Sequence, residues 1–277
     1  MPTLYIVATP IGNLEDITLR AVRTLGEVGL IAAEDTRHTR KLLARYDIHT
    51  PLTSYHEHNR TAKLSSLLAA LKEKDVALVT DAGMPGISDP GYELVHGAAE
   101  AGIRVVPIPG ASAVTSALSV SGLPVGQFIY LGFLPRGKGD RRRLLESVAA
   151  ELRGLVAFET PHRLTSALQD VLDTLGDRQI AVCRELTKLH EEIYRGPVSK
   201  ALDKFARPRG EFTLVIEGSQ KKSVTHSIDE AREMLALLRE QGVGAKDSAA
   251  QVAQQTGLSR RVVYRLRHEP ERRTEPS

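Results

Sequence analysis

The sequence is poor in the residues that build several common kinds of site. Its 277 residues contain no Trp, a single cysteine and an aromatic share of 4%. So low an aromatic share argues against an RNA-recognition surface made of stacked rings. One cysteine excludes a disulfide framework and a cysteine-based zinc site. Cys183 lies in an apolar run, and we interpret it as a buried structural thiol.

Long hydrophobic runs are also missing. No stretch is apolar over enough residues to span a bilayer, and the first ten residues lack the basic and apolar segments of a secretory signal. We therefore expect a protein of the cytoplasm that makes no membrane contact. No metal site is predicted either, because His56, His58 and Asp35 match no standard ligand spacing.

Familiar catalytic motifs are absent as well. The chain has no G-x-x-x-x-G-K-[ST], no G-x-S-x-G, and no G-x-G-x-x-G after its first apolar run. These absences disfavour a P-loop NTPase and the commonest arrangement of a serine hydrolase.

One stretch that is present, ALVTDAGMPGISDPGY at residues 77–92, indicates a ligand site. The apolar run at 76–80 predicts a buried parallel strand. The loop after it holds three glycines, two prolines and the carboxylates Asp81 and Asp89. Glycine lets the backbone approach a ligand closely and proline stiffens the loop. Ligands bind at the carboxyl ends of strands in such sheets, so we predict a binding site here.

Apolar runs alternate with helical patterns along most of the chain, which is typical of an α/β fold. Strands are predicted at 4–9, 30–35, 76–80 and 104–110, and again at 127–133, 154–160, 179–185, 191–196 and 211–218. The last three lie close together, which favours a mixed second sheet. The segment GLPVG at 122–126 separates the halves. We therefore predict three domains, an α/β domain at 1–122, a second at 123–218 and a helical domain at 219–277.

Positive charge gathers in the tail and in one internal cluster. Residues 1–218 hold 26 Lys+Arg and 26 Asp+Glu, whereas residues 219–277 hold 11 and 8. The segment at 245–269 reads as helix, tight turn and helix, with Arg260 and Arg261 opening the second helix. Arg141, Arg142 and Arg143 form the internal cluster. Clustered cations attract phosphate backbones, so both regions are candidates for nucleic-acid contact.

Seven segments in consistent order resemble the small-subunit ribosomal RNA methyltransferase I family, the rRNA cytidine 2′-O-methyltransferase branch of the tetrapyrrole methylase superfamily. They are ATPIGNLEDIT (8–18), AEDTRHTRKLL (33–43), SYHEHN (54–59), DAGMPGISDPG (81–91), PIPGASAV (107–114), FETPHR (158–163) and RELTKLHEE (184–192). The resemblance implies two α/β domains with S-adenosylmethionine in the cleft between them. It also implies methylation of the ribose 2′-hydroxyl of a cytidine in 16S rRNA.

The resemblance also implies which residues contact the donor. They are Pro10, Gly12, Asp81, Gly83, Met84, Pro85, Ser112, Ala113, Phe158, Leu186, Phe212 and Thr213. One departure concerns the first loop, where members acting on tetrapyrroles tend to show G-x-G-P-G and this chain has ATPIG. That difference argues against a porphyrinoid pocket.

A ribose hydroxyl is a poor nucleophile at neutral pH, so methyl transfer needs alignment and a proton acceptor. Alignment is worth effective molarities on the order of ~10⁵ M or more, and a base adds roughly 10²-fold or more. The candidate bases are Asp35, His56, Glu159 and Glu185. The residues predicted to hold RNA phosphates are Arg37, Arg40, Arg141, Arg142, Arg143, Arg163, Arg260 and Arg261.

The expected partners are 16S rRNA or the small ribosomal subunit, and the superfamily resemblance favours a homodimer. Two alternatives stay open. A small-molecule methylase of the same superfamily is disfavoured by the altered first loop and by the basic tail. A helix-turn-helix regulator whose large domain senses a ligand is disfavoured because the two-helix element is a small fraction of the chain.

Overall fold

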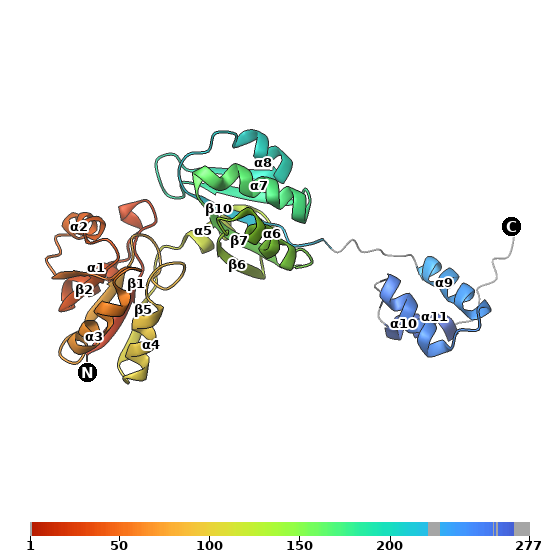
Figure 1. The fold of residues 1–277 in the computed structure, drawn as a ribbon, viewed down its shortest axis with the longest axis horizontal. Coiled ribbons are helices and arrows are strands. Elements are labelled where there is room, and N and C mark those ends of the chain that lie inside the picture. Colours follow the sequence, from red (N-terminus) through yellow and green to blue (C-terminus); the bar gives the residue numbers. More distant parts are fainter. Residues whose placement is uncertain (1, 221–227, 257, 259, 269–277) are drawn as a thin grey trace. The chain divides into compact units, whose positions relative to one another are not determined.

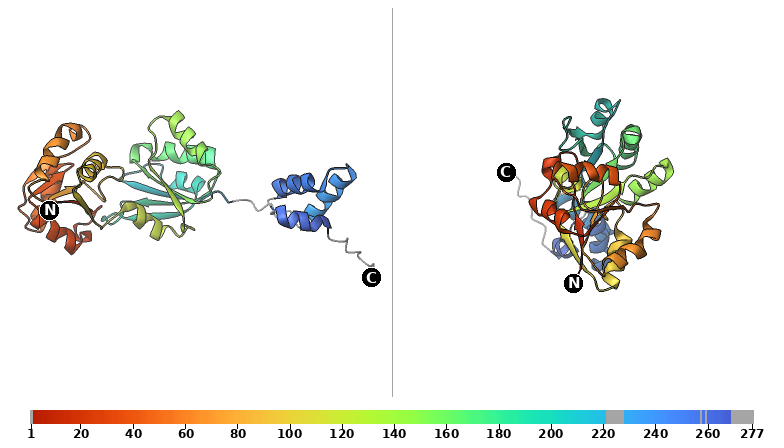
Figure 2. Two further views of the ribbon diagram at one scale, coloured as in Figure 1. Left: turned by 90° about the horizontal axis from the view of Figure 1, so that it is seen from below. Right: turned by 90° about the vertical axis from the view of Figure 1, so that its left-hand side faces the viewer.

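The computed structural model describes residues 2–220, 228–256, 258 and 260–268. Contacts divide the chain into two compact units, Met1–Ser219 and Gln220–Ser277. The first unit contains two five-stranded sheets with helices on both faces of each, so it has the α/β architecture that the sequence predicts (Figures 1 and 2).

The first sheet is wholly parallel, with strand order β3-β2-β4-β1-β5. Its strands are β1 (Thr3–Val7), β2 (Leu30–Ala33), β3 (Leu52–Ser54), β4 (Val76–Val79) and β5 (Arg104–Ile108). Its helices are η1 (Leu14–Asp16), α1 (Leu19–Glu27), α2 (Thr36–Arg45), α3 (Arg60–Ala70) and α4 (Tyr92–Glu100). The short edge strand β3 was not predicted; the other four strands were, to within a few residues at each end.

Both faces of this sheet are buried. One core cluster joins Leu4 and Leu78 to Leu67 of α3 and Leu94 of α4. A second cluster on the other face joins alternate strand residues to helices α1 and α2. Strands covered on both sides read as continuous apolar runs, which explains why β4 is fully buried along its length.

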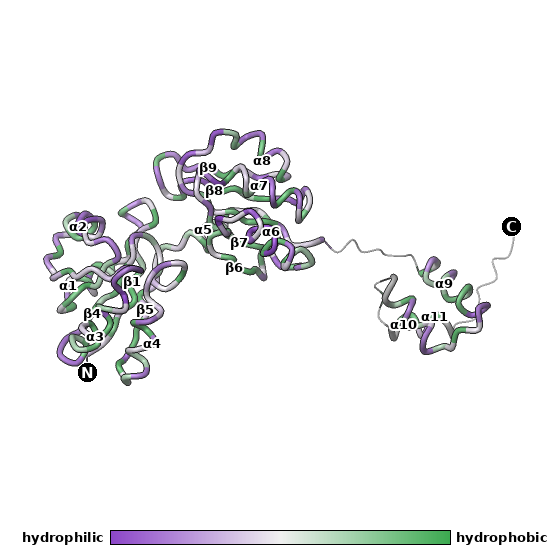
Figure 3. Tube along the Cα trace, viewed as in Figure 1, coloured by the Kyte–Doolittle hydropathy of each residue, from purple (hydrophilic) through white to green (hydrophobic). Residues whose placement is uncertain are grey.

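The second sheet is mixed, as predicted, with strand order β6-β7-β10-β8-β9. Strands β6 (Phe128–Phe133) and β7 (Gly154–Glu159) pair in parallel. Strands β8 (Gln179–Arg184), β9 (Glu192–Pro197) and β10 (Phe212–Ile216) pair antiparallel with their neighbours. Hydrophobic residues, which colour the tube green in Figure 3, make up much of the strands of both sheets.

Helices cover the two faces of the second sheet differently. The helices α6 (Lys138–Ser147), α7 (Pro161–Leu175) and α8 (Val198–Lys204) share one core with it. The helix α5 (Ala113–Ser121) covers the opposite face, where Ala117 and Leu118 pack against residues of β7, β8 and β10. Helix α5 follows the first sheet in sequence yet packs on the second, so it ties the two sheets together.

The second unit is helical. It comprises α9 (Ile228–Glu240), α10 (Ala245–Thr256) and α11 (Arg260–His268), which share a core that includes Leu235, Val252 and Val263. No helix among the described residues has the length and apolarity needed to cross a bilayer.

Candidate active site

The loops that follow β1 and β4 are tied together at the carboxyl end of the first sheet. The backbone N–H of Thr9 donates to the carbonyl of Gly83 at 2.9 Å, and the Gly83 N–H donates back to the Thr9 carbonyl at 3.0 Å. The Thr9 hydroxyl also donates to the Thr80 carbonyl at 3.0 Å. These bonds hold the start of the 81–91 loop next to the first loop.

The carboxyl groups of Glu34, Asp81 and Asp89 lie close together beside the hydrogen bonds between these two loops. The Asp81 N–H donates to Glu34 at 3.3 Å, and the N–H of Asp35 donates to Asp81 at 3.2 Å. Burial, together with the charges of Glu34 and Asp81, raises the pKa of Asp89 to about 7. Burial is also the largest influence on Glu34, whose pKa is raised above its usual value. Such perturbed groups in a recess are typical of functional sites.

The first loop also touches a turn of the second half. Gly12 lies so close to the 186–188 turn that an added Cβ would come within 2.5 Å of the Lys188 Cγ and 2.8 Å of the Leu186 carbonyl. The Asn13 N–H donates to the Thr187 hydroxyl at 3.1 Å. Thr187 has a φ of 64°, in the left-handed region that non-glycine residues rarely adopt. This close contact fixes the turn, and with it Leu186, against the first half.

A cavity of about 620 Å³ lies between the two halves of the first unit, within the size range of about 300–1,000 Å³ for small-molecule sites. Nine of the twelve predicted donor contacts line it: Asp81, Gly83, Met84, Ser112, Ala113, Phe158, Leu186, Phe212 and Thr213. The other three do not. Gly12 instead packs against the turn of the second half, Pro85 is buried, and Pro10 lies in the loop tied to Gly83.

Of the four candidate bases, the structure places only Glu159 at the cavity. Its Oε1 accepts from the Thr160 N–H at 2.7 Å and pairs with the Arg163 guanidinium at 2.8 Å. Its Oε2 is buried and has no hydrogen-bond partner among the described residues. Burial raises the pKa of Glu159 in spite of these contacts. A buried carboxylate with one oxygen unused is suited to accept a proton.

The other three candidates are not brought to the cavity. Asp35 caps α2 and binds the Arg37 guanidinium, with Oδ2 2.7 Å from Nη2, which holds its pKa well below the usual value. Glu185 accepts from Lys188 Nζ at 2.9 Å and from the Glu211 N–H at 2.8 Å, and these bonds outweigh burial and lower its pKa. His56 lies beyond β3, with a buried Nδ1.

Several cavity residues were not predicted to act there. Glu34 lines the cavity, whereas the next residue, Asp35, caps helix α2. Asp89 belongs to a loop that the sequence marks as a site, so its position there was a usable signal. Tyr130 carries no such signal. Cys183 also lines the cavity and is buried as predicted, and burial raises the pKa of its thiol to about 11.

The predicted RNA-contacting arginines differ widely in exposure. The side chain of Arg37 is 85% exposed, and Arg40 is also exposed. Arg143 is exposed and pairs with Asp140. Arg163 is 20% exposed and donates to the Leu134 carbonyl at 2.9 Å.

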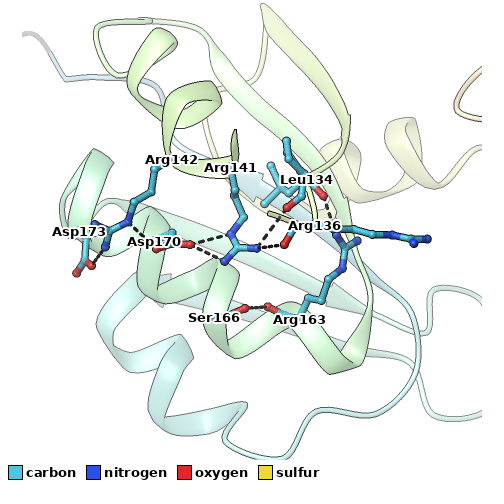
Figure 4. Close-up of polar contacts among 9 residues, drawn as sticks. Leu134, Arg136, Arg141, Arg142, Arg163, Ser166, Asp170 and Asp173 are labelled. Atoms are coloured by element: carbon cyan, nitrogen blue, oxygen red, sulfur yellow. Dashed lines mark hydrogen bonds and ion pairs between the residues drawn. The ribbon is translucent and has the colours of Figure 1, made fainter. Parts of the chain in front are cut away.

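Arg141 is the exception, and its predicted contact with RNA is wrong. Its side chain is 4% exposed, and its Nε and Nη2 donate to Asp170 Oδ2 at 2.8 and 2.6 Å (Figure 4). Its Nη1 donates to the carbonyls of Pro135 and Arg136. Arg142, partly exposed, shares Asp170 through Oδ1 at 2.8 Å. The cluster therefore joins α6 to α7. Arg260 and Arg261 open α11, but their side chains lie outside the described part of the chain.

Comparison with known proteins identifies the family. Residues 3–202 match the family model described as Tetrapyrrole (Corrin/Porphyrin) Methylases, and residues 225–269 match the RsmI C-terminal HTH domain. Ribosomal RNA small subunit methyltransferase I of Halalkalibacterium halodurans is 47% identical over 96% of this chain and 95% of its own length. Its counterpart in Thermotoga maritima is 54% identical over 79% of this chain and 100% of its own length. The chain belongs to the ribosomal RNA small subunit methyltransferase I family.

Solved structures agree with this family's fold. The methyltransferase CobJ superposes with a TM-score of 0.60 at 17% identity, over 79% of this chain and 95% of its own. Uroporphyrin-III-C-methyltransferase from Thermus thermophilus superposes with a TM-score of 0.55 at 22% identity, over 78% of this chain and 94% of its own. The predicted fold class and the helix-turn-helix reading of the tail are confirmed.

S-adenosylmethionine is the methyl donor of this family of methyltransferases, and the cavity fits it. The donor carries a sulfonium and an ammonium group, which are cations, and an adenine, which is flat and largely apolar. The carboxyl groups of Glu34, Asp81, Asp89 and Glu159 line the cavity and can interact with cations, and Phe158 and Phe212 supply apolar surface. A carboxylate that is buried and incompletely bonded, as Glu159 is, suits a cationic ligand.

Proposed function

We propose that this protein transfers a methyl group from S-adenosylmethionine to the ribose 2′-hydroxyl of a cytidine in 16S rRNA. The observation that carries the proposal is one cavity that combines a carboxylate cluster with nine of the twelve positions expected to contact the donor. The family relationship supports it, because the relatives are named for the small-subunit ribosomal RNA.

Residues of both halves would hold the donor. Asp81 lies at the tip of β4 and is oriented by the Asp35 N–H, so its carboxylate can bind a cation or ribose hydroxyls. Leu186 and Phe212 bring apolar surface from the second half. When bound, the donor supplies an electrophilic methyl group on a sulfonium. Holding the ribose oxygen in line with that methyl is the main task of the chain, because alignment supplies effective molarities on the order of ~10⁵ M or more.

We assign Glu159 as the residue that accepts the proton of the ribose hydroxyl. The 2′-oxygen forms a bond to the methyl carbon, the carbon–sulfur bond breaks with its electron pair going to sulfur, and the hydroxyl proton has to leave. Arg163 and the Thr160 N–H hold one carboxylate oxygen of Glu159, which leaves the other to receive that proton. A raised pKa makes the carboxylate of Glu159 a stronger proton acceptor.

Exposed arginines near the cavity would bind RNA phosphates. Arg37 lies close enough to Asp81 for that carboxylate to add to the raised pKa of its guanidinium, whose largest cause is the hydrogen bond to Asp35. Arg40 extends the exposed positive surface on α2. We also propose phosphate contacts for Arg142, Arg143 and Arg163 of the first unit and, separately, for Arg260 and Arg261 of the second unit, and we leave Arg141 out.

We further propose that 16S rRNA or the small ribosomal subunit is the substrate, that the enzyme acts in the cytoplasm, and that it is a homodimer. Transfer of labelled methyl from S-adenosylmethionine is compared for small subunits lacking the modification, naked 16S rRNA and a tetrapyrrole. We expect label in RNA at one cytidine, where the 2′-O-methyl group blocks alkaline cleavage of the backbone. Label only in the tetrapyrrole, or in neither RNA substrate, contradicts the proposal. Sedimentation of the protein tests the homodimer.

A further inference from the structure

One wall of the cavity is aromatic and is not needed for the proposed donor contacts. Phe128, Tyr130 and Phe133, all on β6, line the cavity. Phe128 and Phe133 are 42% and 51% exposed. The chain has only five Phe, and four of them line this cavity, Phe158 and Phe212 being the other two. Aromatic side chains are thus concentrated at one site in a protein that has few of them.

An irregularity in β6 directs this wall. Alternate residues of a strand face opposite sides of a sheet, and Ile129 and Leu131 pack in the core shared with α6 and α7. Regular alternation would send Phe133 to that same core. The pairing with β7 shifts between Tyr130 and Phe133, and Gly132 adopts a φ of 67°, in the left-handed region. The bulge therefore turns Phe133 to the cavity face beside Tyr130, a use of bulges that recurs near active sites.

The rings of this wall pack edge to face with Phe158, and part of the Phe133 ring remains exposed. The rings of Tyr130 and Phe133 lie edge to face with Phe158, with centroids 5.3 and 5.4 Å away. The Tyr130 hydroxyl lies 2.7 Å from the Ser88 hydroxyl, a hydrogen bond between β6 and the 81–91 loop. Asp89 of the same loop also lines the cavity, and at a pKa of about 7 its carboxyl can both donate and accept hydrogen bonds. A flat ring with a polar edge is complementary to such a combination.

We propose that the β6 wall is the subsite for the nucleobase whose ribose is methylated, and that the base stacks against Phe133 and Phe128. This rests on the proposed function. An enzyme that reaches the ribose of a nucleotide in folded RNA benefits from taking its base out of the stack, and aromatic side chains receive such bases. The wall is continuous with the cavity that the donor fits, so a base held there keeps its own ribose close to the methyl group.

The test substitutes the exposed ring and measures three quantities. Phe133→Ala removes it, Phe133→Leu keeps apolar bulk without a ring face, and Phe133→Tyr keeps the ring. Leu152→Ala is the matched control, because Leu152 is 53% exposed in the same half of the unit and lies outside the cavity. The measurements are kcat/KM for small subunits that lack the modification, the Kd of S-adenosylmethionine by calorimetry, and the mass in solution.

Loss of one base–aromatic stack costs about 1–3 kcal/mol, which is roughly a 5- to 150-fold fall in kcat/KM. We expect that fall for Phe133→Ala and Phe133→Leu, recovery in Phe133→Tyr, and no effect of Leu152→Ala, with donor Kd and mass unchanged throughout. An equal loss of donor affinity would assign the wall to the donor and overturn the subsite. A change in mass would assign it to a second copy of the chain, and an unchanged kcat/KM or full activity of Phe133→Leu would also refute stacking. Absence of transfer by the wild type instead refutes the proposed function itself.

Discussion

The buried ion cluster between α6 and α7 predicts a large cost for losing one carboxylate. Asp170 is 2% exposed and accepts from the guanidinium groups of Arg141 and Arg142. Burial opposes its ionisation, but these hydrogen bonds outweigh burial and lower its pKa. Asp170→Ala leaves the Arg141 cation buried and, among the described residues, hydrogen-bonded only to the carbonyls of Pro135 and Arg136. Breaking a buried pair on one side costs about 3–5 kcal/mol, and we expect the free energy of unfolding to fall by that amount.

A double variant separates the ion pair from the packing. In Asp170→Leu with Arg141→Met both buried charges are replaced by apolar groups, so most of the loss should be recovered. Unfolding in urea is followed by far-ultraviolet circular dichroism, because the chain has no Trp. The double variant should also retain its affinity for RNA, since Arg141 is structural. A loss below about 1 kcal/mol in Asp170→Ala would refute the reasoning, as would loss of RNA affinity in a fully folded double variant.

Three further predictions concern the site. Glu159→Gln should lower kcat for methyl transfer roughly 10²-fold or more and remove the acidic limb of its pH profile; wild-type kcat would exclude it as the proton acceptor. Arg37→Ala should weaken binding to rRNA and reduce the slope against salt by about 1, with donor affinity unchanged. The control is Arg153→Ala, which also removes an exposed arginine paired with a carboxylate two residues earlier, and it should change neither RNA binding nor donor affinity. Loss of donor affinity in Arg37→Ala would contradict the role of Arg37 in binding RNA. Folded Asp89 keeps its proton up to about pH 7 while the unfolded chain loses it near pH 4, so the free energy of unfolding declines as the pH rises across that range. Asp89→Asn should therefore raise the free energy of unfolding by about 2–4 kcal/mol at pH 8 and by close to nothing at pH 4. An equal effect at both pH values would contradict the raised pKa.

Local sequence was sufficient for most of the fold. Apolar runs predicted nine of the ten strands, because buried strands consist of continuous runs of β-branched and aliphatic residues. Strand β3 was missed because its three residues, Leu52–Ser54, are too few to show a period. The packing of α5 on the second sheet was not predicted either. Its small apolar residues fit either sheet, and only the three-dimensional connection decides between them.

The site was predicted as far as neighbours in sequence determine it. The 81–91 loop was found because glycine, proline and aspartate at a strand tip are a local signal. Arg141 and Arg143 stand in one run of three arginines and yet differ completely, because Asp170 lies 29 residues beyond Arg141. Tyr130 was missed for the same reason, since its place at the cavity depends on the sheet and not on its neighbours. Sequence patterns report periods and turns, whereas burial and pairing depend on distant residues.

The central claim is that the cavity at the tip of β4 binds S-adenosylmethionine, and a calorimetric titration tests it most directly. Wild-type protein is compared with Asp81→Ala and with Asp203→Ala, which removes an exposed carboxylate of the second half that pairs with Lys200 at 3.5 Å. Among the described residues, the Asp81 carboxylate accepts a single hydrogen bond, from the Asp35 N–H at 3.2 Å, so its loss should leave the fold intact. The account predicts saturable binding by the wild type and by Asp203→Ala, and affinity at least about tenfold weaker in Asp81→Ala, the loss of one charge-assisted contact. Equal affinity in all three proteins, or no binding by the wild type, would contradict it.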